Sequence, residues 1–409
     1  MHQEREDGQF DRRTVLKWIA AAGAVGAIGR PLELLAAVAD PVTADALAAR
    51  PTFKFPEKTD LILLTERPPN LETPIRHFRD DLTRNEAFFV RWHLGIVPTR
   101  IDTKQFRLAL TGHVDNVLSL SLDDLKKEFE PASVVAVCQC SGNGRGLFQP
   151  QVPGGQWGNG AVGNARWTGV KLSDLLKKAG VRAGAVDVAF GGMDKSPLPG
   201  TAPFVKSLPI DHEKVGETIL AYAMNDQPLP MLNGFPLRIV VPGWYATYWV
   251  KAVNEIAVTD KKYEGFWMAK AYRTPATPNM NEKPAELAKE TVPITDMTCR
   301  SMIVTPEPGD KAPAGKPYEV TGVAFDSGKG IKQVEVSVDG GKTWQQATLD
   351  PEIGKYSWRR FRHRFEPAAG THTVLSRATN AAGETQTTEQ WNRSGYGRNV
   401  IESVALTVA

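Results

Sequence analysis

The sequence predicts an α+β domain with a largely mixed or antiparallel sheet, followed by an all-β sandwich. From about residue 83 to 260, short apolar runs alternate with turn residues and a few helical stretches. Beyond about residue 299, short strand patterns follow one another, separated mostly by Gly- and Asp-containing turns. Residues 275–300 contain several prolines and form a linker. We therefore expect two domains, over 49–280 and 281–409.

The first 48 residues have the features of an export signal. Arg12-Arg13 precede an Ala/Gly-rich apolar run over 18–28, which is too short and too weakly hydrophobic to span a bilayer. Small residues at 37–39 or 46–48 offer two cleavage sites. The pattern resembles a twin-arginine signal, which exports folded proteins, and implies a periplasmic location. A frayed amphipathic N-terminus is the alternative, and no later segment is a candidate to cross a membrane.

Four stretches of the first domain allow a local structural prediction. Residues 50–75 are rich in Pro, Lys and Glu without clear periodicity, and predict an extended arm over the surface. Residues 122–129 predict a short helix capped by the preceding serine, and residues 172–179 predict a second helix that ends before Gly180. The β-branched run 235–242 predicts a buried strand.

Short strands are the only elements expected in the second domain. They are predicted at 318–325, 330–338, 341–349 and 372–378. Asp339-Gly340-Gly341, between two of them, signals a hairpin. A further strand over 358–365 would place Arg360, Arg362 and Arg364 on one face. A solvated or salt-bridged strand is the favoured interpretation, and a subunit or cytochrome contact is the sharper alternative.

Composition and motif content exclude several classes of ligand and cofactor. The chain is 42% hydrophobic and 23% charged with a net charge of +3, and it lacks the basic, aromatic-interleaved region of a nucleic-acid binder. The seven histidines form no zinc-type cluster, and neither a phosphate-binding glycine loop nor a haem-attachment motif is present. Three cysteines make no disulfide framework. We therefore expect no haem, zinc or bound dinucleotide in this chain.

The most informative stretch runs from Val135 to Arg145. A β-branched run delivers a cysteine to a turn of Ser, Gly and Asn, where a thiolate can bind a soft metal close to the backbone. Arg145, which follows at once, can hold an oxyanion. Cys138 and Cys140 would share one face of a strand, but the turn near Cys140 should break the alternation, so only one is expected in a given site. A buried structural cysteine is the commoner alternative.

Three further clusters accompany this stretch. Arg91 and His93 share one strand face, which invites an anion but also suits a strand with a polar face. Trp157 and Trp167 lie near turns, and Trp167 is expected to anchor the core. Tyr272, between two cationic residues at the domain junction, can donate a proton or a hydrogen bond, or can be an interface residue.

Together these residues resemble the sulfite oxidase family of molybdenum enzymes, most closely its bacterial periplasmic sulfite dehydrogenases. The resemblance covers nearly the whole chain after the signal, and the order of the motifs carries it. They are Phe-x-Arg-x-His at 89–93, Cys-x-Gly-Asn-x-Arg at 140–145, Trp157, Arg-Trp-x-Gly at 166–169, Tyr222–Pro230, Gly234–Arg238, Val240–Gly243, Val250-Lys251, Tyr272 and Ser337–Trp344. Any one is weak, but so many in this order are very specific.

The resemblance implies a sulfite-oxidase-type molybdopterin domain with mixed sheets, followed by an immunoglobulin-like dimerisation domain. It implies a molybdenum-molybdopterin cofactor whose metal is bound by the Cys140 thiolate, with Cys138 left in the core. The cofactor-binding residues that it implies are Phe89, Arg91, His93, Cys140, Asp194, Arg238, Trp249 and Lys251. The catalytic residues that it implies are Arg91 and Arg145, which would bind sulfite, with Tyr272 and Trp157 beside them.

The implied activity is oxidation of sulfite to sulfate. Electrons would pass to a separate c-type cytochrome, because the chain has no haem domain, and the protein would form a homodimer or a heterodimer with a cytochrome subunit. The alternatives are the related sulfane dehydrogenase of thiosulfate oxidation and, in a different class, a non-catalytic binding or assembly protein on the same scaffold.

Two departures from the family pattern affect the expected site. Where animal members have the arginine of a Trp-Asn-x-Arg-Gly motif, this chain has Ser394, so a third substrate arginine is left open between Arg393 and Arg398. Asn233 stands where the family has a histidine on the cofactor side.

Overall fold

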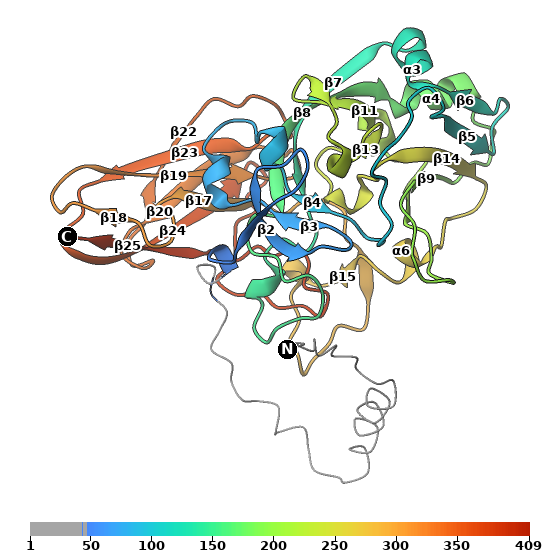
Figure 1. The fold of residues 1–409 in the computed structure, drawn as a ribbon. Helices are drawn as coiled ribbons and strands as arrows, with labels where there is room; N and C mark the ends of the chain where they lie inside the picture. The colour runs from blue at the N-terminus through green and yellow to red at the C-terminus, as the bar shows by residue number, and fades with distance from the viewer. Residues whose placement is uncertain (1–42, 44–46) are drawn as a thin grey trace, which may run out of the picture. The chain divides into compact units, whose positions relative to one another are not determined.

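β-Strands make up most of the regular structure in the computed structural model, which describes Thr43 and residues 47–409 (Figure 1). The strands are β1 (Thr52–Lys54), β2 (Asp60–Thr65), β3 (Asn70–Glu72), β4 (Val90–Arg91), β5 (Leu108–Gly112), β6 (Leu118–Leu120), β7 (Pro131–Gln139), β8 (Val162–Lys171), β9 (Asp187–Gly192), β10 (Val205–Pro209), β11 (Ile219–Met224), β12 (Gln227–Pro228), β13 (Arg238–Val240), β14 (Val253–Thr259), β15 (Arg273–Pro275), β16 (Thr291–Pro293), β17 (Arg300–Thr305), β18 (Lys311–Ala312), β19 (Tyr318–Phe325), β20 (Ile331–Ser337), β21 (Gln345–Gln346), β22 (Thr348–Leu349), β23 (Arg359–Phe365), β24 (Gly370–Asn380) and β25 (Ser403–Val408). The helices are α3 (Leu122–Glu128), α4 (Leu172–Ala179), α5 (Lys214–Glu217) and α6 (Phe266–Ala269), with 3-10 turns η3 (Ile75–Phe78), η4 (Asn85–Ala87), η5 (Arg145–Leu147), η6 (Met231–Asn233), η7 (Ala246–Tyr248) and η8 (Pro278–Met280).

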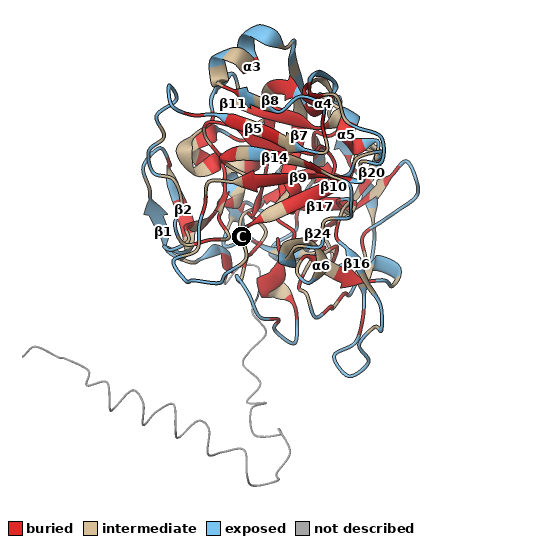
Figure 2. Ribbon diagram, turned by 90° about the vertical axis from the view of Figure 1, so that its right-hand side faces the viewer, coloured by how far each residue is buried: buried red, intermediate tan, exposed pale blue. Residues whose placement is uncertain are grey.

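The first domain is built on two five-stranded sheets. One has the order β10-β9-β14-β5-β6, in which β5 and β14 are parallel and the other pairs are antiparallel. The other has the order β12-β11-β8-β7 with β13 added to β11, and its pairs are antiparallel. The central strands are largely buried, as Figure 2 shows for β9. The mixed-sheet prediction is therefore confirmed.

Two helices begin and end where the sequence predicts. α3 starts after Ser121, whose hydroxyl accepts the Asp124 N–H while the Asp124 carboxylate accepts the Ser121 N–H, a reciprocal cap. α4 ends at Gly180 in the left-handed region, a conformation that glycine adopts without steric penalty. Leu172, Leu175 and Leu176 of α4 are buried, which anchors the helix on the sheets.

Two predictions for the first domain need correction. Residues 50–75 are no featureless surface arm, because β1, β2 and β3 form a sheet with β4 that buries Leu61 and Leu71 against Trp92. The strand expected over 235–242 is limited to Arg238–Val240. The prolines at positions 236 and 242 lack an N–H donor, so the hydrogen-bonded ladder extends little further.

The C-terminal part is a two-sheet β-sandwich. Sheet β17-β19-β23-β22 faces sheet β18-β25-β24-β20-β21, and Val320, Val334, Val374 and Leu406 are among the side chains of its core. β19 has the predicted bounds, and β20 and β21 form the predicted hairpin. The strand expected over 341–349 is divided into β21 and β22, which join different sheets.

The stretch between the domains is partly structured. β15 ends at Pro275, the first residue of the linker expected over 275–300, and pairs with β16, which lies inside that linker. Met302, Phe325 and Trp358 of the sandwich belong to the same apolar core as the first domain. The exact domain boundaries therefore stay a prediction, although the fold class is as expected.

Three other expectations can be compared with the structure. Arg360, Arg362 and Arg364 of β23 pair with Asp81, Asp350 and Glu319, so the salt-bridged interpretation of this strand holds. The export signal lies outside the described residues, apart from Thr43, Leu47 and Ala48. No helix in the described part of the chain is long and apolar enough to cross a membrane.

Candidate functional site

A cavity of about 400 Å³ opens where β4, β7 and β13 end or begin. Its lining residues are Phe89, Arg91, His93, Cys140, Ser141, Leu232, Asn233, Arg238, Ala246, Thr247, Lys251 and Tyr272. Seven of these are residues that the family resemblance assigned to the site: Phe89, Arg91, His93, Cys140, Arg238, Lys251 and Tyr272. None of the described lining residues is acidic, so the cavity suits an anion.

The Cys140 turn is fixed by backbone hydrogen bonds to the 156–161 loop. The Cys140 N–H donates to the Ala161 carbonyl at 2.9 Å, and the Gly144 N–H donates to Gly158 at 2.7 Å. Gly144 has φ of +84°, and a Cβ atom there would lie 2.6 Å from Arg398 Cδ. A glycine is therefore required both by the backbone conformation and by the space available.

The two cysteines occupy different environments. Cys140 lines the cavity, whereas Cys138 is fully buried and its sulfur accepts a hydrogen bond from Arg238 Nη2 at 3.2 Å. Burial raises the pKa of Cys138, although Arg238 and Lys251 act in the opposite direction. Strand alternation alone left the choice between them open, and only Cys140 is in position to meet a ligand in the cavity.

Buried cations surround the cavity. Burial, together with nearby Arg238 and Arg91, lowers the pKa of Lys251 to about 7, while Asp194 acts in the opposite direction. Arg238 donates to the Asn233 carbonyl at 2.9 Å, and burial lowers its pKa too. Such a concentration of desolvated positive charge is costly unless an anion compensates it.

Several polar atoms at the cavity have no hydrogen-bond partner among the described residues. They are Nη1 of Arg91, Nε of Arg238, and the hydroxyls of Ser141 and Thr247. Native proteins rarely leave buried polar groups unsatisfied, so these atoms point to a missing polar ligand. The described residues contain no cluster of three His, Cys, Asp or Glu side chains that holds a metal by itself. The residues thus fit a large anionic cofactor whose metal takes one protein thiolate.

His93 and Tyr272 form a hydrogen-bonded pair at the cavity wall, between His93 Nε2 and the Tyr272 hydroxyl. The His93 ring stacks on Phe204 with centroids 3.5 Å apart. Burial lowers the pKa of His93 well below its usual value, and Arg91 lowers it further, so the imidazole is neutral near pH 7. Burial raises the pKa of Tyr272, so its hydroxyl stays protonated.

A loop of the second domain completes the site. Tyr396, between β24 and β25, stacks on Tyr272 with centroids 5.3 Å apart and an interplanar angle of 9°. The Arg145 guanidinium lies 4.8 Å from the Tyr396 ring and donates to the Ser394 carbonyl at 3.2 Å. The Gly397 N–H donates to the Ser141 carbonyl at 3.0 Å, which ties this loop to the cysteine turn.

Four predicted site residues do not line the cavity. Arg145 is buried beside Tyr396, and Trp157 is buried in the loop that faces the cysteine turn. Trp249 packs near Arg238, 5.7 Å from its guanidinium, and its indole donates to Val241. Asp194 is buried near Lys251, and burial raises its pKa. These residues support the cavity-lining groups, and their individual roles stay predictions.

Neither candidate for a third substrate arginine faces the cavity. Arg393 is bound to the buried Glu282 carboxylate at 2.5 Å, and Arg398 pairs with Glu402 at 3.2 Å. The Arg393 charge is therefore compensated by Glu282, whereas Arg398 shares the single Glu402 carboxylate with the buried Arg300.

Sequence reasoning missed several residues of the site. Lys58 is buried and donates to the Asn233 side chain, which in turn donates to the Phe89 carbonyl at 3.0 Å. Tyr396 lies in the Trp391–Gly397 segment, where the family pattern led to the expectation of a substrate arginine but of no aromatic site residue. Lys206 of β10 is buried behind Tyr272. Nothing in the local sequence pattern marks these residues, because each acts through a contact distant in the chain.

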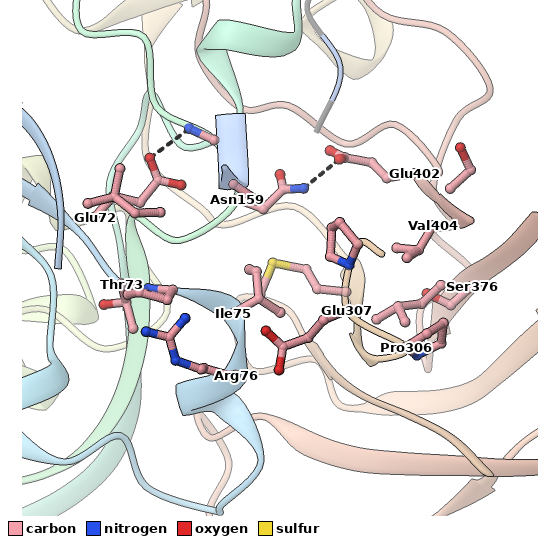
Figure 3. A pocket seen from close by; sticks show the side chains of 18 of the residues that line it. Glu72, Thr73, Ile75, Arg76, Asn159, Pro306, Glu307, Ser376, Glu402 and Val404 are labelled. Carbon is pink, nitrogen blue, oxygen red and sulfur yellow. Dashed lines mark hydrogen bonds between the residues drawn. The ribbon is translucent and has the colours of Figure 1, made fainter. Parts of the chain in front are cut away.

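A second cavity, with about 850 Å³ of space, lies at the junction of the two domains and shares no lining residue with the first (Figure 3). Its acidic groups already have partners. The Glu72 carboxylate accepts the Gly158 and Gly160 N–H groups at 2.9 Å and pairs with Arg50, while Glu402 accepts from Asn159 at 2.5 Å. Glu72 thereby holds the loop that carries Trp157.

Comparison with known families agrees with this geometry. Residues 93–267 match the oxidoreductase molybdopterin binding domain, and residues 291–408 match the Mo-co oxidoreductase dimerisation domain. The chain therefore carries a molybdopterin-binding domain of the molybdenum oxidoreductase type, followed by the corresponding dimerisation domain. The cofactor prediction is confirmed.

The relatives identify the family. Chicken (Gallus gallus) sulfite oxidase is 32% identical over 358 residues, which cover 83% of this chain and 74% of that protein. Mitochondrial sulfite oxidase of Rattus norvegicus is 35% identical over 299 residues, or 70% of this chain. The chain belongs to the sulfite oxidase family. It spans only about half of the rat protein's length, 53%.

The architecture also matches a solved structure. The sulfane dehydrogenase SoxCD from Paracoccus pantotrophus has a TM-score of 0.72 and 25% sequence identity, over 94% of this chain and 96% of that chain. The arrangement of a molybdopterin domain followed by a β-sandwich is therefore shared along nearly the whole of both chains.

Proposed function

We propose that the protein oxidises sulfite to sulfate and passes the electrons to a c-type cytochrome. Sulfite and water give sulfate, two protons and two electrons. The observation that carries the proposal is the cavity that combines one thiol, Cys140, with Arg91, Arg238 and Lys251 and with no described acidic lining residue. When bound, the molybdenum cofactor supplies the oxygen-atom transfer and takes up the two electrons.

Arg91 is the residue best placed to bind the substrate. Its Nη1 is buried at the cavity without a partner among the described residues. A guanidinium remains charged when desolvated and presents a fork of donors to an oxyanion. The neutral His93 and the protonated Tyr272 add hydrogen-bonding groups without adding negative charge.

The cations further inside the cavity serve the cofactor. Arg238 and Lys251 lie on neighbouring backbone segments joined by an antiparallel bridge. Their positive charge suits the phosphate of the pterin, which would restore the protonated state of Lys251. The cofactor is thus held by one charge cluster and the substrate by another.

Molybdenum analysis of the purified protein, followed by a sulfite-dependent cytochrome c reduction assay, tests the proposal. We expect bound molybdenum and reduction of the cytochrome. Metal-loaded protein that reduces no cytochrome with sulfite would contradict the proposed reaction. Protein without molybdenum would instead favour a non-catalytic binding or assembly role.

Substitution of Arg91 tests its part. Arg91→Met removes one charged contact to the substrate and should raise the sulfite KM at least tenfold, since charged hydrogen bonds contribute about 1.5–3 kcal/mol. Arg100→Met, at an exposed position, is the control. An unchanged KM would remove Arg91 from the substrate site.

The similarity to SoxCD supports a second candidate, oxidation of a sulfane sulfur bound to a carrier protein. Parallel assays with free sulfite and with a carrier-bound sulfane separate the two. A much higher kcat/KM for the carrier-bound substrate would favour the second candidate.

We also propose that the protein is exported to the periplasm by the twin-arginine route. Arg12 and Arg13 support this proposal at the sequence level. Cell fractionation of the natural protein and of a variant with Arg12→Lys and Arg13→Lys is the test, and retention of both proteins in the cytoplasm would contradict it.

A further inference from the structure

Lys206 is a fully buried lysine that the proposed reaction does not yet use. It lies in β10 and is 1% exposed. Its Nζ donates to the Trp267 carbonyl at 2.7 Å and lies 4.5 Å from the Tyr248 ring centroid and 5.2 Å from that of Tyr272. Two aromatic faces and one carbonyl thus replace the water around this ammonium.

No carboxylate in the described part of the chain pairs with Lys206. The neighbours on β9 and α6 are apolar or aromatic, and α5, which also packs on β10, carries Lys214 and Glu217, which pair with each other at 2.7 Å. A buried cation without a counter-charge is costly, and burial lowers the pKa of Lys206 to about 7. A buried cation with a perturbed pKa next to a cavity is a candidate for a role at that site.

The ammonium acts on the substrate cavity through Tyr272. Tyr272 lines the cavity, and it also stacks on Tyr396, which in turn contacts Arg145. Two cations, Lys206 and Arg145, thus flank this pair of tyrosines. The pKa of His93, the hydrogen-bond partner of Tyr272, is lowered first by burial and then by Arg91, Lys251 and Lys206.

The cavity lacks the charge that a third arginine would bring, because neither Arg393 nor Arg398 is among its described lining residues. We propose that Lys206 is a positioning residue that supplies an additional positive charge from behind Tyr272 and thereby favours doubly charged oxyanions over singly charged ones. This inference rests on the proposed function for the identity of the substrate, but not for the binding of anions.

Anion binding to molybdenum-loaded protein, measured by calorimetry with sulfate and with nitrate, tests the inference. At an effective dielectric constant near 20, a charge that lies about one Debye length (roughly 8 Å at physiological salt) from a dianion changes its affinity about tenfold once salt screening is included. Because the electrostatic interaction energy scales with the charge of the ligand, Lys206→Met should weaken sulfate binding about tenfold and nitrate binding about threefold. Lys270→Met, which removes an exposed lysine close to Trp267, is the matched control and should change neither.

The conservative variant separates charge from packing. Lys206→Arg keeps a permanent cation and should retain sulfate binding, whereas Met fills a similar volume without charge. If Lys206 only packs against the tyrosines, Met should bind sulfate as well as the natural protein does. Equal loss of nitrate and sulfate in Lys206→Met would also overturn the inference.

The pH dependence gives a third measurement. The titratable groups around Lys206 are Tyr248, Tyr272 and His93, whose pKa values are shifted by burial away from neutrality. Sulfate binding should therefore weaken as the pH rises from about 6 to 9 in the natural protein, less so in Lys206→Arg. Any pH dependence of sulfate binding that remains in Lys206→Met arises from other titratable groups, such as Lys251. An identical pH dependence in all three proteins would contradict the role of Lys206.

Failure of the proposed reaction is distinguishable from failure of this inference. Sulfate binding that depends on Lys206 in a protein that does not oxidise sulfite would keep the inference and reject the reaction. Sulfite oxidation with a KM that is unchanged in Lys206→Met would keep the proposed reaction and reject the inference about Lys206.

Discussion

Substitution of Glu72 should weaken the loop that carries Trp157, although Glu72 lies outside the cofactor cavity. Its buried carboxylate accepts the N–H groups of Gly158 and Gly160 and pairs with Arg50 at 2.6 Å. Arg50 also donates to the Gln156 carbonyl at 2.9 Å, so Arg50 and Glu72 together hold both ends of this loop. Glu72→Gln keeps the shape of the side chain and removes the charge.

The expected cost follows from these contacts. Hydrogen bonds to a charged group contribute about 1.5–3 kcal/mol each, and breaking a buried ion pair costs about 3–5 kcal/mol. The glutamine oxygen can still accept one N–H, and Arg50 is partly exposed, with 22% of its side-chain surface accessible. We therefore expect a loss of about 3 kcal/mol in the free energy of unfolding.

Denaturant unfolding of the metal-loaded protein measures this loss, with Glu66→Gln on the exposed part of the same hairpin as the control. The sulfite KM should also rise, because Gly144 and Gly146 of the cysteine turn donate to the loop that Glu72 holds. A double-mutant cycle with Arg50→Met should show coupling of about 1 kcal/mol or more. A loss below 1 kcal/mol together with additive single effects would refute the reasoning.

Three further outcomes follow from the structure. Cys140→Ser should abolish turnover while Cys138→Ser largely keeps it, and equal loss in assays of both variants would argue against the ligand assignment. Burial lowers the pKa of Lys58 to about 7, below its value in the unfolded chain. The contribution of Lys58 to stability is therefore lost as the pH falls from about 10 towards 7. The urea midpoint of the metal-free protein should be higher at pH 9 than at pH 7, and Lys58→Met should reduce that difference. Leu47 is buried against Gly146 and Gly158, so mass spectrometry of the exported protein should find cleavage at the earlier small-residue site, and an N-terminus at Ala49 would contradict this expectation.

The candidate site shows how far local sequence carries a prediction. Phe89 and His93 flank the two-residue strand β4, and they line the cavity together with Arg91. Period-two alternation is a property of an extended backbone, so their common side was predictable. Cys140 ends a β-branched run at a glycine turn, and the spacing to Arg145 sufficed to mark the stretch as unusual. The choice between Cys140 and Cys138 needed the motif order, because alternation does not extend through a turn.

The contacts across the chain were not predictable in the same way. Tyr396 meets Tyr272 more than a hundred residues away, and Lys206 lies behind the same ring from a third segment. Residues 50–75 lack a clear apolar period because their strands are only three to six residues long. Short strands carry too few residues for a period to be detected.

The sequence by itself determined the two-domain order, the helices α3 and α4, the cysteine turn and the cationic character of the site, because caps, turns and alternation are local properties of the chain. The tertiary structure decided which thiol faces the cavity, that neither Arg393 nor Arg398 lines it, and that Lys206 lies behind Tyr272 without a carboxylate partner among the described residues. These facts depend on burial and on partners distant in the chain, and only the packed structure sets burial and partners.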